Sequence, residues 1–134
     1  MATRGYRTFE DDAARAWLDR LGASEGTELL ELALLGQADE EAYLDYNQAV
    51  EILAAAEILH GLLYGPREGV PERAAQWIES HGQVDVACLK PVCERQLGRV
   101  LAEPCELHRA WQENKELYPK WKANVLELQR AMTD

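Results

Sequence analysis

One stretch of the chain, residues 46–64 (YNQAVEILAAAEILHGLLY), is apolar on almost every face when it is drawn as an α-helix. A helix that is hydrophobic all round is normally surrounded by the other elements of a core. Glu57 places a carboxylate in the middle of this stretch, among small and apolar neighbours. The pattern therefore predicts a central helix over about residues 46–64 that carries a buried acid.

The rest of the chain shows the spacing of amphipathic helices and little of the alternation that strands show. Ala14, Trp17, Leu18 and Leu21, for example, follow the i, i+3, i+4, i+7 rule. Glycine and proline mark where helices stop and start. Besides the central helix, the predicted helices end at Gly22, cover about Thr27–Leu35, run from Pro71 to Gly82, cover about Asp85–Ala102, start near Cys105, and carry the stripe Trp121, Val125, Leu128 and Met132. We therefore expect residues 1–134 to form an all-α, single-domain bundle of six or seven helices.

The formal net charge of the 134-residue chain is −10, and most of this charge lies in its first part. Residues 1–60 contain 13 acidic and 4 basic side chains, which gives −9. An acidic surface repels phosphate backbones, so we expect no nucleic-acid partner. The same surface can attract a basic protein partner, or it can simply keep the protein in solution.

No part of the sequence has the features of an export signal or a membrane anchor. The first residues contain no apolar run that could act as a signal peptide. The apolar stretch 49–64 is shorter than the ~20 residues of a membrane span, and it contains Glu51, Glu57 and His60. We therefore expect a cytoplasmic protein without membrane contact.

Two sets of residues have part of a metal-binding pattern. Glu57 and His60 form one ExxH, whereas di-iron bundles need a second ExxH and further glutamates. The other set has the Cys3His composition that zinc accepts, and consists of Cys88, Cys93, Cys105 and His108. On one helix, however, the first two cysteines would point about 140° apart at ~100° per residue. We therefore expect no metal and no cofactor, and reduced thiols that pack as small apolar residues.

Four segments, in order along almost the whole chain, carry a family resemblance. They are GYRTFEDDAARAWLDRL (residues 5–21), ILAAAEILHGLLYGP (residues 52–66), Arg99-Val100-Leu101, and Pro104-Cys105-Glu106-Leu107 followed by Trp111 and Trp121. Together they resemble a bacterial family known only as domain-of-unknown-function family 4259. The chain departs from that pattern at Arg4, Arg7, Ala16 and Cys105, where Trp, Gly, Asp and Ser are usual. The resemblance implies a small helical protein and no particular activity.

Glu57 is the strongest candidate for a functional residue. A buried carboxylate needs a partner or a raised pKa, because an unpaired buried charge costs several kcal/mol. One interpretation is a structural ion pair with an arginine from another helix, for which we consider Arg73, Arg95, Arg99 and Arg130. The resemblance favours Arg99, which lies in a family-like segment. The other interpretation is a carboxylate that acts in acid–base chemistry or binds a ligand.

The segment from Gly5 to Asp12 combines aromatic residues with successive acids. Phe9, Glu10, Asp11 and Asp12 are candidates for a recognition surface or a site for a hard cation. The structural interpretation is that Phe9 packs under the first helix as a hydrophobic staple, while the acids stabilise the helix N-terminus. Both interpretations stay open at this point.

No arrangement of residues indicates a familiar catalytic mechanism. The two serines, Ser24 and Ser80, do not lie in a GxSxG sequence, and there is no phosphate-binding glycine loop. We therefore predict a non-catalytic, acidic protein-binding module, comparable to immunity or antitoxin proteins. The alternative is a small-ligand-binding or hydrolytic domain that uses Glu57. It predicts a cavity lined by polar groups beside Glu57, and solid packing with an arginine clamp would argue against it.

Overall fold

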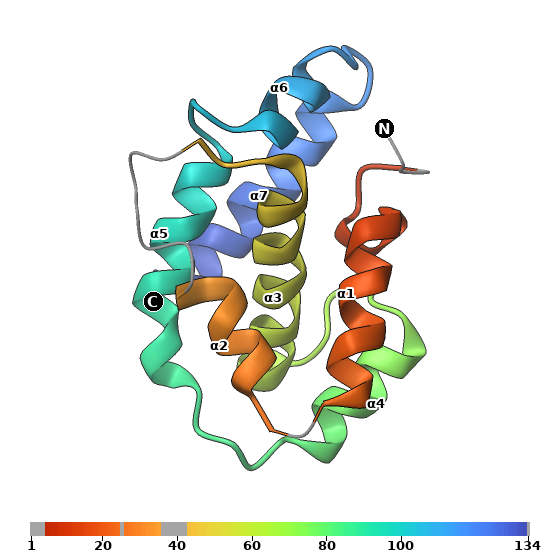
Figure 1. The fold of residues 1–134 in the computed structure, drawn as a ribbon, viewed down its shortest axis with the longest axis vertical. Coiled ribbons are helices and arrows are strands. Elements are labelled where there is room, and N and C mark those ends of the chain that lie inside the picture. The colour runs from red at the N-terminus through yellow and green to blue at the C-terminus, as the bar shows by residue number, and fades with distance from the viewer. Residues whose placement is uncertain (1–4, 25, 36–42, 134) are drawn as a thin grey trace.

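Helices make up nearly all the regular structure of residues 5–24, 26–35 and 43–133, which the computed structural model describes (Figure 1). In chain order they are η1 (Thr8–Glu10), α1 (Asp12–Ala23), α2 (Glu28–Leu35), α3 (Tyr46–Tyr64), α4 (Glu72–Ser80), η2 (Ala87–Leu89), α5 (Lys90–Val100), α6 (Glu106–Gln112) and α7 (Tyr118–Met132), where η denotes a 3-10 helix. Within these residues, extended backbone pairs at one bridge, between Leu44 and Cys105. The expected all-α single-domain bundle is confirmed.

The central helix α3 has the predicted bounds and contacts each of the other α-helices. Figure 1 shows it between α1 and α5. The Asp45 carboxylate accepts a bond from the Gln48 amide, and the Gln48 side chain accepts one from the Asp45 amide, so a capping box begins the helix. Every residue of α3 from 52 to 59 is buried. In the described part of the chain, no helix has both the length and the apolarity to cross a membrane.

Several helix ends differ from the predicted ones by a few residues. Gly22 does not end α1, which continues to Ala23. Pro71 precedes α4 as its N-cap and is not its first residue. The helix expected over about residues 85–102 is divided into η2 and a shorter α5, because Pro91 lacks an amide hydrogen and fits best in a first helical turn. The predicted stop of α2, Gly36, lies outside the described residues.

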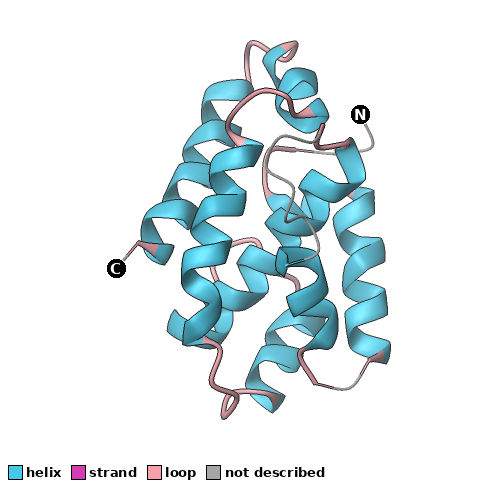
Figure 2. Ribbon diagram, turned by 60° about the vertical axis from the view of Figure 1, so that its left-hand side comes forward, coloured by secondary structure: helices cyan, strands magenta, loops and turns pink. Residues whose placement is uncertain are grey.

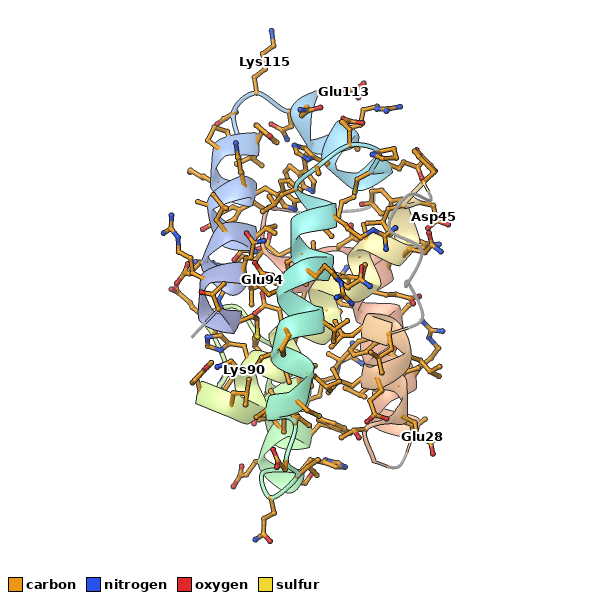
Figure 3. The ribbon with its side chains drawn as sticks, turned by 90° about the vertical axis from the view of Figure 1, so that its left-hand side faces the viewer. Glu28, Asp45, Lys90, Glu94, Glu113 and Lys115 are labelled. Atoms are coloured by element: carbon orange, nitrogen blue, oxygen red, sulfur yellow. The ribbon has the colours of Figure 1, made fainter. Side chains whose placement is uncertain are left out.

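Aromatic stacking joins α6 to α7. Figure 2 shows the described chain as helices joined by loops. The rings of Trp111 and Trp121 are stacked with centroids 5.8 Å apart. His108 Nε2 lies 2.7 Å from the Tyr118 hydroxyl beside them. All four tryptophans are buried, as their positions on apolar stripes predict. In the turn between these helices, the side chain of Lys115 points away from the bundle (Figure 3).

Candidate functional site

Glu57 forms a buried ion pair in the middle of α3, and its partner is Arg67. Arg67 Nη1 donates to Glu57 Oε2 at 3.0 Å. Thr8 Oγ1, from η1, donates to the same oxygen at 2.8 Å. The side chains of Glu57 and Arg67 are 6% and 13% exposed, so this pair is largely removed from water. The prediction of a buried, paired acid agrees with this geometry.

The loop after α3 carries Arg67 back over the helix. Gly65 ends α3 with a φ of 101°, a backbone conformation that other residues rarely adopt. Pro66 follows and cannot continue the helix. The chain therefore turns at once, and the long side chain of Arg67 reaches back along α3 to Glu57. Two residues after Arg67, Gly69 has a φ of 90°, and a Cβ atom built there would lie 2.5 Å from Arg7 Cδ.

The choice of Arg99 as the partner of Glu57 was wrong. Arg99 Nη1 instead donates to Gln96 Oε1 at 3.0 Å on its own helix. Arg73, another of the arginines considered, pairs with Asp19 of α1. The prediction sought a partner on a helix, whereas Arg67 lies in a loop. Its position just after the Gly-Pro stop of the central helix is the sequence signal that could have suggested it.

The environment of Glu57 favours its neutral form more than water does. Burial raises the pKa of this carboxyl above its ordinary value of 4.5, and the guanidinium of Arg67 and the hydroxyl of Thr8 act in the opposite direction. Oε1 of Glu57 is buried and has no hydrogen-bond partner among the described residues. Oε2 therefore accepts both of the hydrogen bonds that Glu57 receives from Thr8 and Arg67.

Beside Arg67 lies a surface pocket of about 420 Å³. Three separate parts of the chain form it: the segment before η1, the end of α3 with the loop that follows, and α7. Its polar lining residues include Arg7, His60, Arg67, Lys120, Asn124 and Glu127. The arginine clamp anticipated for Glu57 is therefore present, which argues against a Glu57 that acts on a ligand. Glu57 does not line the pocket, so the cavity lies beside Arg67 and not beside the acid.

In this pocket, hereafter the Arg67 pocket, the guanidinium groups of Arg67 and Arg7 each contact an exposed glutamate. Arg67 Nη2 donates to Asn124 Oδ1 at 2.8 Å and to Glu127 Oε2 at 3.3 Å. Arg7 Nη2 lies 3.5 Å from Glu68 Oε1. The side chain of Glu127 is 75% exposed and that of Glu68 is 87% exposed. The charged side chains of this pocket were therefore not among the functional candidates predicted from the sequence. They are Arg7, Arg67, Glu68, Lys120 and Glu127.

The four N-terminal candidates have separate surroundings. Phe9 is buried. Asp11 Oδ1 caps α1 by accepting from the Ala13 amide at 2.8 Å, and its other oxygen accepts from the Tyr46 hydroxyl. Asp12 pairs with Arg15 one turn along α1. The carboxylate of Glu10 lies against the backbone of Gly5, where a Cβ atom would meet it. These contacts fit the structural interpretation, and a binding role for the four residues stays a prediction.

The residues with partial metal-binding patterns do not assemble in the described part of the chain. No group of three or more His, Cys, Asp or Glu side chains there could hold a metal ion. Cys88 is exposed, whereas Cys93 is buried. Burial raises the pKa of the Cys93 thiol to about 12, so this thiol is protonated at neutral pH.

Comparison with known proteins points to a family without an assigned activity. Residues 2–124 match the family model described as "Domain of unknown function (DUF4259)". No curated protein and no solved structure matches the chain. Clues to the function therefore come from the geometry of the described residues.

Proposed function

Because the chain belongs to the family of domains of unknown function DUF4259, we propose its function from its own geometry: a non-catalytic binding domain that holds a small anionic molecule in the Arg67 pocket. The observation that carries this proposal is the convergence of Arg7, Arg67 and Lys120 on one pocket of about 420 Å³. Pockets for small molecules have volumes of roughly 300–1,000 Å³.

Arg67 offers an anion a donor group that is already in position. The guanidinium has five N–H donors in a planar fork that matches carboxylate and phosphate groups. Glu57 and Asn124 hold the fork in place from the protein side. Glu127 contacts it from the solvent side and is 75% exposed. Because Glu127 is exposed, water solvates its carboxylate when it turns away from Arg67, so an anionic ligand can take its place.

Two further properties of the pocket support binding of an anion without catalysis. Its described wall contains no serine, threonine or cysteine that could act as a nucleophile. The net charge of −10 does not oppose the binding of an anion, because charges farther away than about 8 Å are screened at physiological salt while the pocket cations touch the ligand.

The proposal predicts that Lys120→Gln weakens the binding of simple anions, whereas Lys115→Gln does not. Both lysines are exposed, but only Lys120 lines the pocket. The expected weakening is roughly two- to fivefold, because an exposed charge contact is worth about 0.5–1 kcal/mol. Titration of isotope-labelled protein with acetate and with inorganic phosphate, followed by NMR, measures the affinity and shows which amides shift.

The amides that shift should belong to residues around the Arg67 pocket. Equal weakening by both lysine substitutions would show that the anions bind to general surface charge, and the proposal would be wrong. Shifts spread over the whole chain would lead to the same conclusion.

We propose as a second candidate function that the face of α2 binds a basic protein, because exposed leucines lie there beside two acids that form no ion pair with a described residue. Leu32 and Leu35 are 65% and 51% exposed. Together with Glu28 and Glu31 they line a shallow depression of about 260 Å³. Glu28 projects from the outer end of α2 (Figure 3). A partner with apolar and basic side chains fits this combination.

The acids on the face of α2 differ from several other acids of the chain in having no ion-pair partner among the described residues. Several other acids of the first 60 residues are neutralised within the fold, in the pairs Asp12–Arg15, Asp19–Arg73, Glu51–Arg20 and Glu57–Arg67. Glu28 and Glu31 form no ion pair with any described residue. The acidic surface available to a partner therefore includes α2.

The second candidate predicts that a partner is captured by the wild type and lost from a Leu32→Ser/Leu35→Ser variant. Affinity capture from the native lysate with elution by rising salt identifies partners, and each is then purified and titrated against both proteins. We expect a basic protein released at moderate salt, with affinity at least about tenfold lower for the variant. Binding that is insensitive to salt, or equal for both proteins, would contradict this candidate.

A further inference from the structure

We infer that the ligand of the Arg67 pocket carries two separate anionic groups, as a small dicarboxylate does, with one group bound by Arg67 and the other by Arg7. This inference rests on the proposed function and specifies its ligand. Arg7 precedes η1 and Arg67 follows α3, so distant parts of the sequence supply the two guanidinium groups. Lys120 of α7 lines the same pocket.

On the side of the pocket, each of the two arginines contacts one carboxylate whose own side chain is exposed. Arg67 contacts Glu127 at 3.3 Å, and Arg7 contacts Glu68 at 3.5 Å. The side chains of Glu127 and Glu68 are 75% and 87% exposed. Water can therefore solvate both carboxylates when a ligand replaces them. The protein's own carboxylates thus occupy the two positions that the carboxylates of a ligand would take.

The charge of the pocket matches a dianion. When Glu68 and Glu127 turn toward solvent, the cations that remain are Arg7, Arg67 and Lys120. Glu57 balances one of them through its buried contact with Arg67. With these two glutamates in solvent, the groups that contact the ligand and Glu57 together carry a formal charge of +2, which a ligand with two carboxylates neutralises and a monocarboxylate does not.

Both arginines are held in position before a ligand arrives. Arg67 is fixed by Glu57 and Asn124. The stem of Arg7 lies across Gly69, and its guanidinium lies 5.3 Å from the centre of the Tyr6 ring. Side chains that are already ordered lose less entropy on binding. Two cations at fixed positions also select for the length of a ligand, because only one spacing of carboxylates reaches both.

Isothermal titration calorimetry with a series of acids tests the inference. The dicarboxylates are malonate, succinate, glutarate and adipate, and each is compared with the monocarboxylate in which a methyl group replaces one carboxylate. We expect one dicarboxylate to bind at least about tenfold more tightly than its partner compound, with weaker binding of shorter and longer chains. Inorganic phosphate serves as a single group of similar charge and should bind less tightly than the best dicarboxylate.

Two substitutions, at half-buried Arg7 and at exposed Glu68, complete the test. Arg7→Gln should lower the dicarboxylate affinity far more than the monocarboxylate affinity, so that their ratio approaches one. Glu68→Gln should strengthen dicarboxylate binding severalfold, because the ligand no longer competes with Glu68 for Arg7. Arg109→Gln is the matched control, since Arg109 pairs with Glu103 and does not line the pocket.

The outcomes separate this inference from the proposed function. If monocarboxylates bind as tightly as dicarboxylates, or if phosphate binds best, or if Arg7→Gln weakens both classes equally, the ligand is not a dicarboxylate although the pocket binds anions. If Glu68→Gln weakens dicarboxylate binding, the assignment of Arg7 is wrong. If no anion binds to the wild type at all, the proposed function itself fails.

Discussion

Replacement of Arg67 by methionine is expected to lower the free energy of unfolding by about 3–5 kcal/mol. The substitution leaves Glu57, whose side chain is 6% exposed, without its charged partner. Thr8 still donates to Oε2, and Oε1 still has no hydrogen-bond partner among the described residues. A charge in this environment must either stay unpaired or take up a proton, and both cost free energy. Denaturation in urea, followed by circular dichroism, measures the change.

The loss should also depend on pH, with a sign that follows from Glu57. Burial already raises its pKa, and Arg67 acts against this rise, so Arg67→Met raises the pKa further. A raised pKa in the folded state stabilises the protein below the unfolded value of 4.5, and this contribution is lost as the pH rises through the folded-state value. The destabilisation should therefore be largest near about pH 8 and become smaller toward about pH 5.

Two comparisons separate the buried charge from other effects of Arg67→Met. Glu57→Gln in the same chain removes the unpaired charge and should restore a large part of the lost stability. Arg20→Met breaks the pair with Glu51, in which the arginine is 57% exposed, and should lower stability by at most about 1 kcal/mol. An equal effect of Arg67→Met and Arg20→Met, or no recovery in the double variant, would show that the pair with Glu57 is not a buried structural contact.

Leu59→Ala in the central helix is expected to lower the free energy of unfolding by about 2–5 kcal/mol. Leu59 has 0% exposure and lies in the run of buried residues of α3. The substitution removes apolar contacts and leaves a cavity, which the close-packed interior can only partly close. Chemical denaturation at neutral pH is the measurement.

Leu32→Ala is the matched control for this prediction. It makes the same chemical change within a helix, so the difference in helix propensity is the same, but Leu32 is 65% exposed. We expect its effect on the free energy of unfolding to stay within about 0.5 kcal/mol. Similar losses for the two leucines would mean that α3 is not the centre of the bundle.

The helices could be predicted because their signals are local. The bounds of α3 follow from the apolar pattern between Asp45, which caps the helix, and Gly65-Pro66, which ends it. Predicted ends were less accurate where two signals compete. Pro91 can interrupt a helix or begin one, and only the packing of the surrounding chain selects the second role.

The candidate site could be predicted only in part. The apolar neighbours of Glu57 along its own helix indicate burial, and the structure agrees. Its partner was missed because Arg67 lies in a loop, outside any periodic pattern, and reaches Glu57 only after the chain has turned at Gly65. Arg7 and Lys120 gave no signal at all, because nothing in a linear sequence shows that they line one pocket with Arg67.

The order of amino acids was enough to predict an all-α bundle around one apolar helix with a buried acid. Periodicity and helix ends depend on residues a few positions apart, so they can be read directly from the order of amino acids. Which arginine meets Glu57, and which cations lie beside that arginine, follows from the packing of separate segments of the chain. Arg67 contacts residues 10 and 57 positions away, and the geometry of these contacts depends on how the loops and helices pack, which no local pattern specifies.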